Sequence, residues 1–230
     1  MKMQTVLAAV FCMLWPVGKT HADINKIECQ TCVMQQRVAE LQAKVDELQQ
    51  KVDFNEIKDV YFKILLEKQW YGGISSSNAW TYAEHVVHYA KEYNNNVDNV
   101  LSIIFVESNF NQWDVSPVGA QGAMQIMPHW KRDSECGTPD GKENYFNLET
   151  NIKRGNCILA KYRKIFNNNF VLAAIAYNKG PETVKWELKH GIDPSNDYDY
   201  KILKELRRLK RWQSPFNQPL PPTDQTLAQR

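Results

Sequence analysis

A carboxylate at the end of an apolar run is the residue in this sequence best suited to acid–base chemistry. Glu107 directly follows the apolar residues 103–106 and is followed by Ser108. Surroundings poor in water disfavour the charged form of a carboxyl group and raise its pKa. A carboxyl group that stays protonated near neutral pH can serve as a general acid. The position therefore favours a catalytic acid, and the alternative is a solvated residue on the exposed side of a helix.

Two further stretches combine small residues with polar groups suited to binding a ligand. In residues 116–128, glycines allow the backbone to approach a ligand closely, and Gln125 and Met127 offer an amide and an adaptable apolar surface. In residues 173–181, a small-residue helix ends with Tyr177 and Asn178 before Gly-Pro. Each stretch alone also fits a structural interpretation, as a tight turn before a buried helix or as a helix cap.

Together these stretches resemble the catalytic domain of the soluble lytic transglycosylases, a family with a lysozyme-like helical fold. The family signature is Glu-Ser, then Gly-x-x-Gly-Leu-Met-Gln-Ile-Met-Pro, then Ala-Tyr-Asn-Ala-Gly, with an Asn-Ile-x-x-Gly segment before the last block. These blocks stand here at residues 107–108, 119–128, 176–180 and 151–155, and the resemblance covers about residues 97–211. Ala123 replaces the usual Leu, and Lys179 replaces the usual Ala and would place a charge near the groove.

The resemblance implies an activity and a set of site residues. The enzyme would cleave the β-1,4 bond between N-acetylmuramic acid and N-acetylglucosamine in peptidoglycan and leave 1,6-anhydromuramic acid ends. Glu107 would be the acid/base. Tyr200 is matched to a later tyrosine of the family's substrate groove, although the Glu-Thr-Arg that usually precedes that tyrosine is absent here. The residues implied to bind or support substrate are Ser108, Ser116, Gln125, Met127, Tyr177, Asn178 and Tyr200.

The chemistry implied by the resemblance needs one carboxylate, whereas glycosidases commonly use two. Asp114 is the only nearby candidate for a second one, because no Asp or Glu lies between it and Asp133. The muramic acid 6-hydroxyl is held next to the reacting carbon and supplies the nucleophile, so no metal or cofactor is expected. Two alternatives stay open. One is a muramidase that uses Glu107 to direct water at the sugar, and the other is a non-catalytic glycan-binding adaptor.

The elements that must position these residues are predicted to be helices. Apolar residues recur at helical spacing and show little alternation of period two. The fold class is all-α, with a lysozyme-like catalytic domain behind an N-terminal coiled-coil helix. Helices are expected at about residues 55–69, 78–93, 97–107, 151–166, 170–177, 181–190 and 200–212.

Residues 34–52 carry the heptad spacing of a coiled coil. Their apolar positions alternate four and three apart, with valine at a and leucine at d, which is typical of two-stranded parallel coils. A homodimer or an assembly partner is therefore expected here, and a lone amphipathic helix folded back on the domain is the alternative. The apolar positions are Met34, Val38, Leu41, Val45, Leu48 and Val52.

The N-terminus predicts export to the periplasm. Lys2, an apolar run at residues 6–15 and a small-residue ending near Ala22 are the marks of a signal peptide. The expected organisation is a signal peptide at 1–22, a coiled-coil/helical region at 23–72, the catalytic domain at 73–212 and a Pro-rich disordered tail at 213–230. The net charge of +2 gives no support to a nucleic-acid partner, and the expected partner is the glycan strand of peptidoglycan.

Four cysteines remain after the predicted cleavage, and an even number in an oxidising compartment favours disulfides. We expect Cys136 to pair with Cys157 and to close the loop between them. Cys29 pairs with Cys32 or with a partner chain, and the sequence leaves these two alternatives open.

Overall fold

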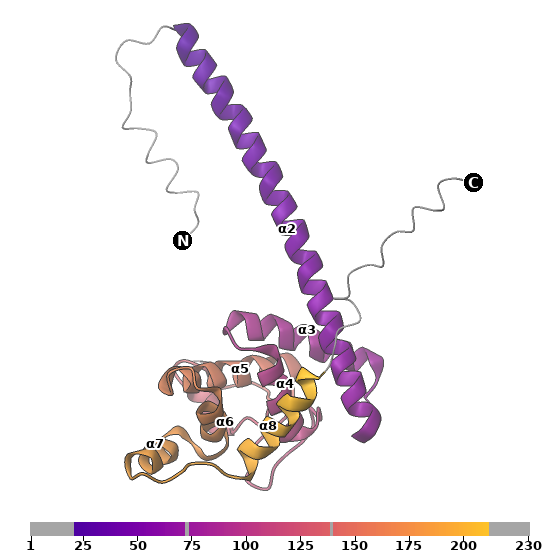
Figure 1. The fold of residues 1–230 in the computed structure, drawn as a ribbon, viewed down its shortest axis with the longest axis vertical. Coiled ribbons are helices and arrows are strands. Elements are labelled where there is room, and N and C mark those ends of the chain that lie inside the picture. The colour runs from indigo at the N-terminus through magenta and orange to yellow at the C-terminus, as the bar shows by residue number, and fades with distance from the viewer. Residues whose placement is uncertain (1–20, 72–73, 139, 212–230) are drawn as a thin grey trace, which may run out of the picture. The chain divides into compact units, whose positions relative to one another are not determined.

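The computed structural model describes residues 21–71, 74–138 and 140–211, and within the first helix the side chains of residues 32–65. These ranges contain α-helices and one 3-10 helix, and their extended pairing is limited to two isolated bridges at residues 115–126 (Figure 1). The all-α class is thereby confirmed. The predicted tail and all but the last two residues of the predicted signal peptide lie outside the described residues. The helices are α2 (His21–Tyr71), α3 (Ser76–Glu92), α4 (Val97–Ser108), η1 (Pro128–Arg132), α5 (Leu148–Ile165), α6 (Phe170–Lys179), α7 (Pro181–Lys189) and α8 (Asp197–Lys210).

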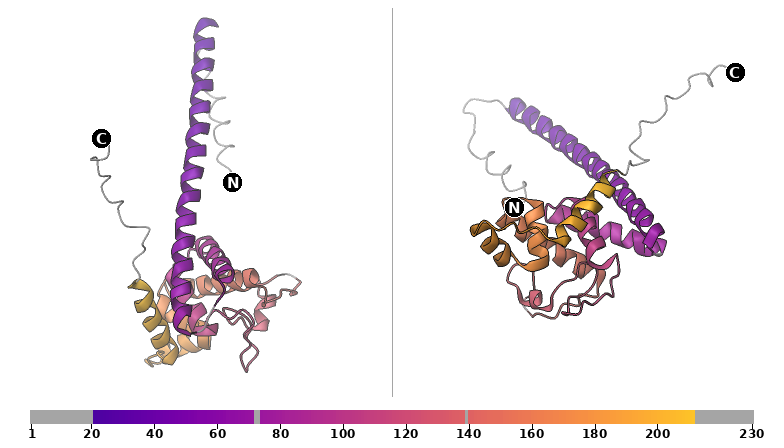
Figure 2. Two further views of the ribbon diagram at one scale, coloured as in Figure 1. Left: turned by 90° about the vertical axis from the view of Figure 1, so that its right-hand side faces the viewer. Right: turned by 60° about the horizontal axis from the view of Figure 1, so that its bottom comes forward.

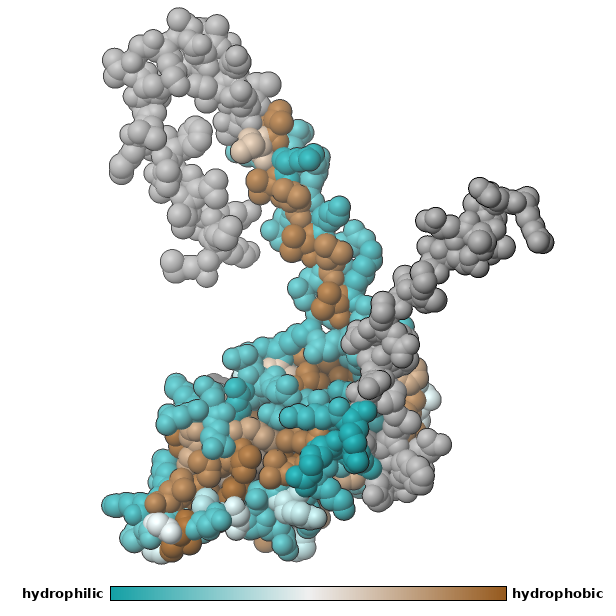
Figure 3. Space-filling view, viewed as in Figure 1, coloured by the Kyte–Doolittle hydropathy of each residue, from teal (hydrophilic) through white to brown (hydrophobic). Residues whose placement is uncertain are grey.

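Helix α2 is continuous where the sequence predicts two helices, and it contributes to two compact units that divide after Val52. In the first unit the heptad side chains from Met34 to Val52 are 53–67% exposed and form an apolar row along the helix (Figure 3). In the second unit Val60 and Ile64 are buried in the core. The second unit begins at Asp53, and the start of the catalytic domain at residue 73 stays a prediction. None of the helices in the described ranges has the length and apolarity needed to cross a membrane.

The core of the second unit is built around α4. This helix buries five consecutive residues, 100–104. It packs against α3 and α8, while α5 packs against α3 and α6; Figure 2 shows the ribbon of these helices from two further sides. A helix that is apolar nearly all round is stable only when neighbours cover it. Asparagine side chains cap the N-termini of four helices and mark where each begins; these are Asn96, Asn147, Asn169 and Asn196.

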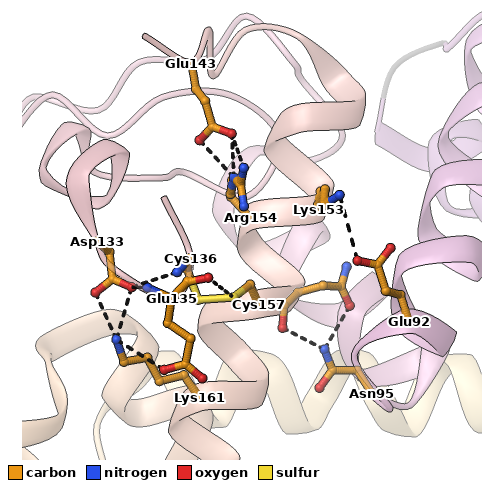
Figure 4. The surroundings of a disulfide bond; sticks show 11 residues. Glu92, Asn95, Asp133, Glu135, Cys136, Glu143, Lys153, Arg154, Cys157 and Lys161 are labelled. Carbon is orange, nitrogen blue, oxygen red and sulfur yellow. Dashed lines mark hydrogen bonds and ion pairs between the residues drawn. A yellow bond between two sulfur atoms is a disulfide. The ribbon is translucent and has the colours of Figure 1, made fainter. Parts of the chain in front are cut away.

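The predicted disulfide between Cys136 and Cys157 is present and joins the loop after η1 to α5, with 5.6 Å between the two Cα atoms. Ion pairs between the same loop and α5 surround it, Asp133 with Lys161 at 2.9 Å and Glu143 with Arg154 (Figure 4). The Cys32 thiol is free and exposed, and the side chain of Cys29 lies outside the described residues.

A buried asparagine on α5 holds the glycine-rich loop at residues 119–127. The Asn151 Oδ1 atom accepts a hydrogen bond from Met124 N at 2.7 Å, and its Nδ2 atom donates to the carbonyls of Gln121 and Tyr145, both at 2.8 Å. A Cβ on Gly122 would lie 2.3 Å from the Tyr145 carbonyl oxygen, so only glycine fits there. The Asn-Ile-x-x-Gly segment thus has a structural role, which is to fix this loop against α5.

Two glycine-to-alanine substitutions separate backbone strain from close packing in this loop. Gly119 and Gly122 both have positive φ, 89° and 79°, but a Cβ at Gly119 would meet nothing within 4 Å. We expect Gly119→Ala to lower the free energy of unfolding by about 1 kcal/mol through left-handed strain alone. Gly122→Ala adds overpacking against the backbone and should lower it by about 3 kcal/mol. Urea unfolding measures both, and equal losses would contradict the proposed packing role of Gly122.

Candidate active site

Glu107 lies in the last turn of α4 and has one neutral hydrogen-bond partner. The Tyr198 hydroxyl on α8 donates to the Glu107 Oε1 atom at 2.6 Å. Burial raises the pKa of Glu107 to about 7, because the charged form loses hydration and the Tyr198 hydrogen bond offsets only part of that loss. The structure therefore gives this carboxyl group a substantial protonated fraction near neutral pH.

No second carboxylate in the described residues contributes to this pKa, which burial and Tyr198 determine. Asp114, the sequence candidate for a partner, supports the loop through its backbone. Its carbonyl oxygen accepts hydrogen bonds from Gly122 N at 2.9 Å and from the Gln125 side chain at 3.2 Å. Among all the residues that the structure describes, no group of three His, Cys, Asp or Glu side chains is placed to hold a metal ion.

Two tyrosines border Glu107, and both remain protonated at neutral pH. Burial, with a smaller effect from the charge of Glu107, raises the pKa of Tyr177 and of Tyr198 well above the usual range. The Tyr177 hydroxyl donates to the Met124 carbonyl oxygen at 2.9 Å, which ties α6 to the glycine-rich loop. The carboxyl group and this loop are thus positioned by hydroxyl groups from α8 and α6.

The sequence analysis does not identify Tyr198 as a site residue. It selects Tyr200 instead. Tyr198 is buried on the apolar face of α8 together with Ile202 and Leu206, whereas Tyr200 is 63% exposed. A side chain four residues before Ile202 shares its helix face, and one two residues before it does not. Extending the apolar face of this helix backwards by one turn would have identified Tyr198. A substrate-binding role for Tyr200 stays a prediction.

The chain leaves α4 in a strained conformation that fixes the direction of Glu107. Asn109 and Phe110 both have positive φ, 51° and 60°, which is uncommon for residues other than glycine. The Tyr82 hydroxyl holds this turn by donating to the Phe110 carbonyl oxygen at 2.9 Å. The Ser108 hydroxyl donates to the Ala123 carbonyl oxygen at 2.7 Å and joins the helix end to the glycine-rich loop. The role of Ser108 is therefore to hold the backbone of the glycine-rich loop against the end of the helix that carries Glu107.

Two of the predicted substrate-binding residues, Gln125 and Met127, lie in the loop that Asn151 holds, and Ser116 lies just before it. The Ser116 hydroxyl accepts a hydrogen bond from Ala120 N at 3.0 Å and closes a turn. Gln125 has a positive φ of 49°, and its Nε2 atom donates to the Gly122 carbonyl oxygen at 2.9 Å, which leaves its Oε1 atom available to a ligand. Met127 is partly buried directly before η1.

Asn178 is exposed and lies beside Tyr198. Both residues line a cavity of about 500 Å³, with Asn196, Asp197 and Lys201. The neighbouring Lys179, which the sequence predicts to place a charge near the groove, is paired with an acidic side chain on α7. Its Nζ atom pairs with Glu187 at 2.6 Å and donates to the Pro194 carbonyl oxygen at 2.8 Å. Lys179 thus ties α6 to α7 and the following segment, and its charge is neutralised.

Comparison with known proteins gives matches to one kind of domain. Residues 84–197 match the family model described as the Transglycosylase SLT domain. Soluble lytic murein transglycosylases from Salmonella typhimurium and Escherichia coli are 37% and 35% identical to this chain over 89 residues. The matches cover 37% of this chain and 14% of each relative, so the chain spans only a small part of their length.

Similar solved structures belong to the same group of enzymes. The 70 kDa soluble lytic transglycosylase from Escherichia coli matches with a TM-score of 0.49 and 26% identity, over 56% of this chain and 24% of that one. An inactive mutant of the lytic transglycosylase Slt from Pseudomonas aeruginosa matches over the same shares with a TM-score of 0.46 and 26% identity.

Removing the Tyr198 hydroxyl tests the electrostatic account of Glu107. In Tyr198→Phe the carboxylate loses its donor, so the pKa of Glu107 should rise above its value of about 7, by roughly one pH unit. Tyr200→Phe is the matched control, since Tyr200 is exposed on the other side of α8. Carbon-13 NMR titration of the Glu107 carboxyl group measures both variants. An unchanged pKa in Tyr198→Phe, or an equal shift in Tyr200→Phe, would contradict the assignment.

Proposed function

Residues 84–197 of this chain are a transglycosylase SLT domain, and from that premise we propose that the protein is a peptidoglycan lytic transglycosylase. Its substrate is the glycan strand of peptidoglycan, cleaved between N-acetylmuramic acid and N-acetylglucosamine. Glu107 is the single acid/base, and the reaction leaves 1,6-anhydromuramic acid ends. The proposal is for the whole chain, of which the family model covers the central part.

The observation that carries the proposal is the environment of Glu107. A carboxyl group with a pKa of about 7 is protonated in a large fraction of molecules at neutral pH and is also a competent base once ionised. Tyr198 keeps a donor on the carboxylate in both states of the reaction. With no second carboxylate influencing Glu107 in the described residues, a mechanism that needs one acid and one separate base is disfavoured.

Glu107 acts twice in this mechanism. It first donates its proton to the glycosidic oxygen as the bond from that oxygen to C1 of the muramic acid breaks. The acetamido oxygen of the same sugar supports the positive charge at C1. The Glu107 carboxylate then removes the proton of the 6-hydroxyl as the bond between O6 and C1 forms, which returns Glu107 to its protonated state. No water is consumed, and the attack gains from the high effective concentration of an intramolecular nucleophile.

The remaining predicted residues support this reaction by position. Tyr177 and Ser108 hold the glycine-rich loop through backbone carbonyls, and the Gln125 Oε1 atom is available to accept a hydrogen bond from a sugar. Asn178 and Tyr198 share a cavity that can hold part of the glycan next to the carboxyl group. Met127 and Ser116 complete the proposed substrate-binding set, together with Tyr200, whose place in it rests on the sequence resemblance alone because it is exposed on the other side of α8.

We infer an exported, periplasmic location, because the substrate is outside the cytoplasm and the N-terminal sequence resembles a signal peptide. The disulfide between Cys136 and Cys157 supports this inference, since such bonds persist in oxidising compartments.

Product analysis tests the proposed reaction. Mature protein incubated with purified peptidoglycan should release muropeptides with anhydro ends, and Glu107→Gln should reduce the rate by at least about a thousandfold, because its amide cannot donate a proton. Asp114→Asn is the matched control and should keep activity within a few fold. Mass spectrometry identifies the products.

Each other outcome overturns a stated part of the proposal. If the wild type releases muropeptides with reducing ends and Glu107→Gln does not, the enzyme is a muramidase that uses Glu107 as its acid. Loss of activity in Asp114→Asn would restore a two-carboxylate mechanism. No soluble product from folded, oxidised wild type would favour the glycan-binding adaptor.

We further propose that the exposed heptad face of α2 pairs with a second copy of the chain in parallel. Val38 and Val45 stand at a and Leu41 and Leu48 at d, the arrangement that favours parallel dimers. The g positions are basic at residues 37, 44 and 51, and the e positions 42 and 49 are glutamine. A parallel pair sets g against e, whereas an antiparallel pair would set these cations against one another.

Charged substitutions on two faces of α2 test this pairing. Leu41→Asp with Leu48→Asp should make the mature protein monomeric, because the charges would be buried in the dimer seam. Ala43→Asp with Gln50→Asp adds two acidic residues at outer f positions and should leave the dimer intact. Sedimentation velocity at several concentrations measures the masses. A wild type that stays monomeric throughout would contradict the proposal.

A further inference from the structure

A second candidate binding site, which we name the Trp113 pocket, lies where the loops before α5 meet α3. Its volume is about 420 Å³, and neither Glu107 nor Tyr198 lines it. Aromatic rings and side-chain amides dominate its lining. The residues are Asn78, Thr81, His85, Gln112, Trp113, Asn144, Phe146, Asn147, Leu148 and Glu149.

The pocket presents a flat aromatic platform to solvent. Trp113 is 68% exposed, and its ring is stacked on that of Phe146, with 6.1 Å between centroids and 24° between planes. Leaving so large an apolar surface in water is unfavourable, so a ligand that covers it gains free energy. The apolar face of a pyranose ring, with its axial C–H bonds, matches the size and flatness of such a platform.

Amide donors surround this platform. The Asn144 Oδ1 atom accepts from Phe146 N at 3.0 Å, and the Asn147 Oδ1 atom accepts from Thr150 N at 2.9 Å. Because each side chain uses its carbonyl oxygen on the backbone, its NH₂ group stays available to a ligand. Sugar hydroxyls and the carbonyl of an acetamido group are suitable acceptors for such donors.

The charge of the pocket favours a neutral ligand. Its titratable side chains are His85 and Glu149; burial lowers the pKa of His85, which is therefore neutral at pH 7. Glu149 is ionised and accepts a hydrogen bond from the Tyr89 hydroxyl at 2.6 Å. With no cation among its lining residues, the pocket is suited to the uncharged N-acetylglucosamine units of a glycan strand better than to anionic muramic acid, phosphate or nucleic acid.

A short, tightly bonded loop joins this pocket to the candidate active site. Trp113 follows Glu107 by six residues, and Asn111 N donates to the Ser108 hydroxyl oxygen at 3.2 Å. Asp114, the next residue, accepts from the Gln125 side chain at 3.2 Å. The aromatic platform and the loop expected to bind sugar are therefore held in a fixed relation.

We propose that the Trp113 pocket is a further glycan subsite, which binds an N-acetylglucosamine unit of the same strand at a distance from the bond cleaved at Glu107. This inference rests on the proposed function for the identity of the strand. The stacked Trp113 and Phe146 rings supply the affinity, and the amides of Asn144 and Asn147 orient the sugar.

Binding of a β-1,4-linked oligomer of N-acetylglucosamine tests the subsite without any cleavage. Glu107→Gln in the full mature chain serves as the background, and isothermal titration calorimetry, which needs no tryptophan as reporter, measures the affinity. Adding Trp113→Ala should weaken binding roughly tenfold, and adding Trp113→Phe, which keeps a stacking ring, should weaken it less than about threefold. Trp186→Ala is the matched control, since Trp186 is 55% exposed on α7 outside this pocket and should have no effect.

Cleavage of soluble glycan strands separates this inference from the proposed function. In the otherwise wild-type enzyme, Trp113→Ala should raise KM roughly tenfold with kcat within about twofold. Unchanged oligomer affinity and KM in Trp113→Ala would overturn the subsite while leaving the proposed function standing, as would an equal loss in Trp186→Ala. A wild type that cleaves nothing but binds the oligomer through Trp113 would support the subsite and overturn the proposed function.

Discussion

The organisation of this domain depends on burying one carboxyl group at the end of an apolar helix, with a single phenol as its donor. Burial raises the pKa of Glu107 to about 7 from a usual value of 4.5, and the Tyr198 hydrogen bond limits the rise. Because the folded-state pKa exceeds the unfolded one, Glu107 leaves stability unaffected below about pH 4.5. It lowers stability progressively up to about pH 7, and the loss is complete above that. Burying Glu107 therefore lowers the stability of the fold at neutral pH, and the same burial gives a carboxyl group that can both donate and accept a proton.

The surrounding structure keeps that group in one place. Tyr82 and Ser108 fix the strained turn after α4, while Asn151 and Tyr177 hold the glycine-rich loop from two other helices. Each of these side chains bonds to backbone carbonyl or amide groups, and the loop is further held because Ala123, Met124 and Ile126 are buried in the core. A position set by several independent hydrogen bonds is what an acid–base group needs, since small displacements reduce proton transfer strongly.

The sequence predicts well what local patterns determine. Helical spacing predicts most of the helices and the all-α class, the apolar context of Glu107 predicts its raised pKa, and the pairing of Cys136 with Cys157 is confirmed. What it misses depends on contacts between distant segments. Tyr198 contacts Glu107 across 91 positions, and Lys179 finds Glu187 and Pro194 only once α6 and α7 are packed. The continuity of α2 was missed as well, because the change from heptad face to buried face near residue 53 looks like a helix boundary in the sequence.

In the proposed reaction one buried carboxyl group suffices, because the substrate supplies the nucleophile. The most direct test is to run the cleavage of peptidoglycan in water enriched in the heavy oxygen isotope and to measure the label in the released muramic acid ends. We predict that these ends carry no label, since the oxygen that attacks C1 comes from the sugar's own 6-hydroxyl. Incorporation of one labelled oxygen at C1 would show that water is the nucleophile and would contradict the account.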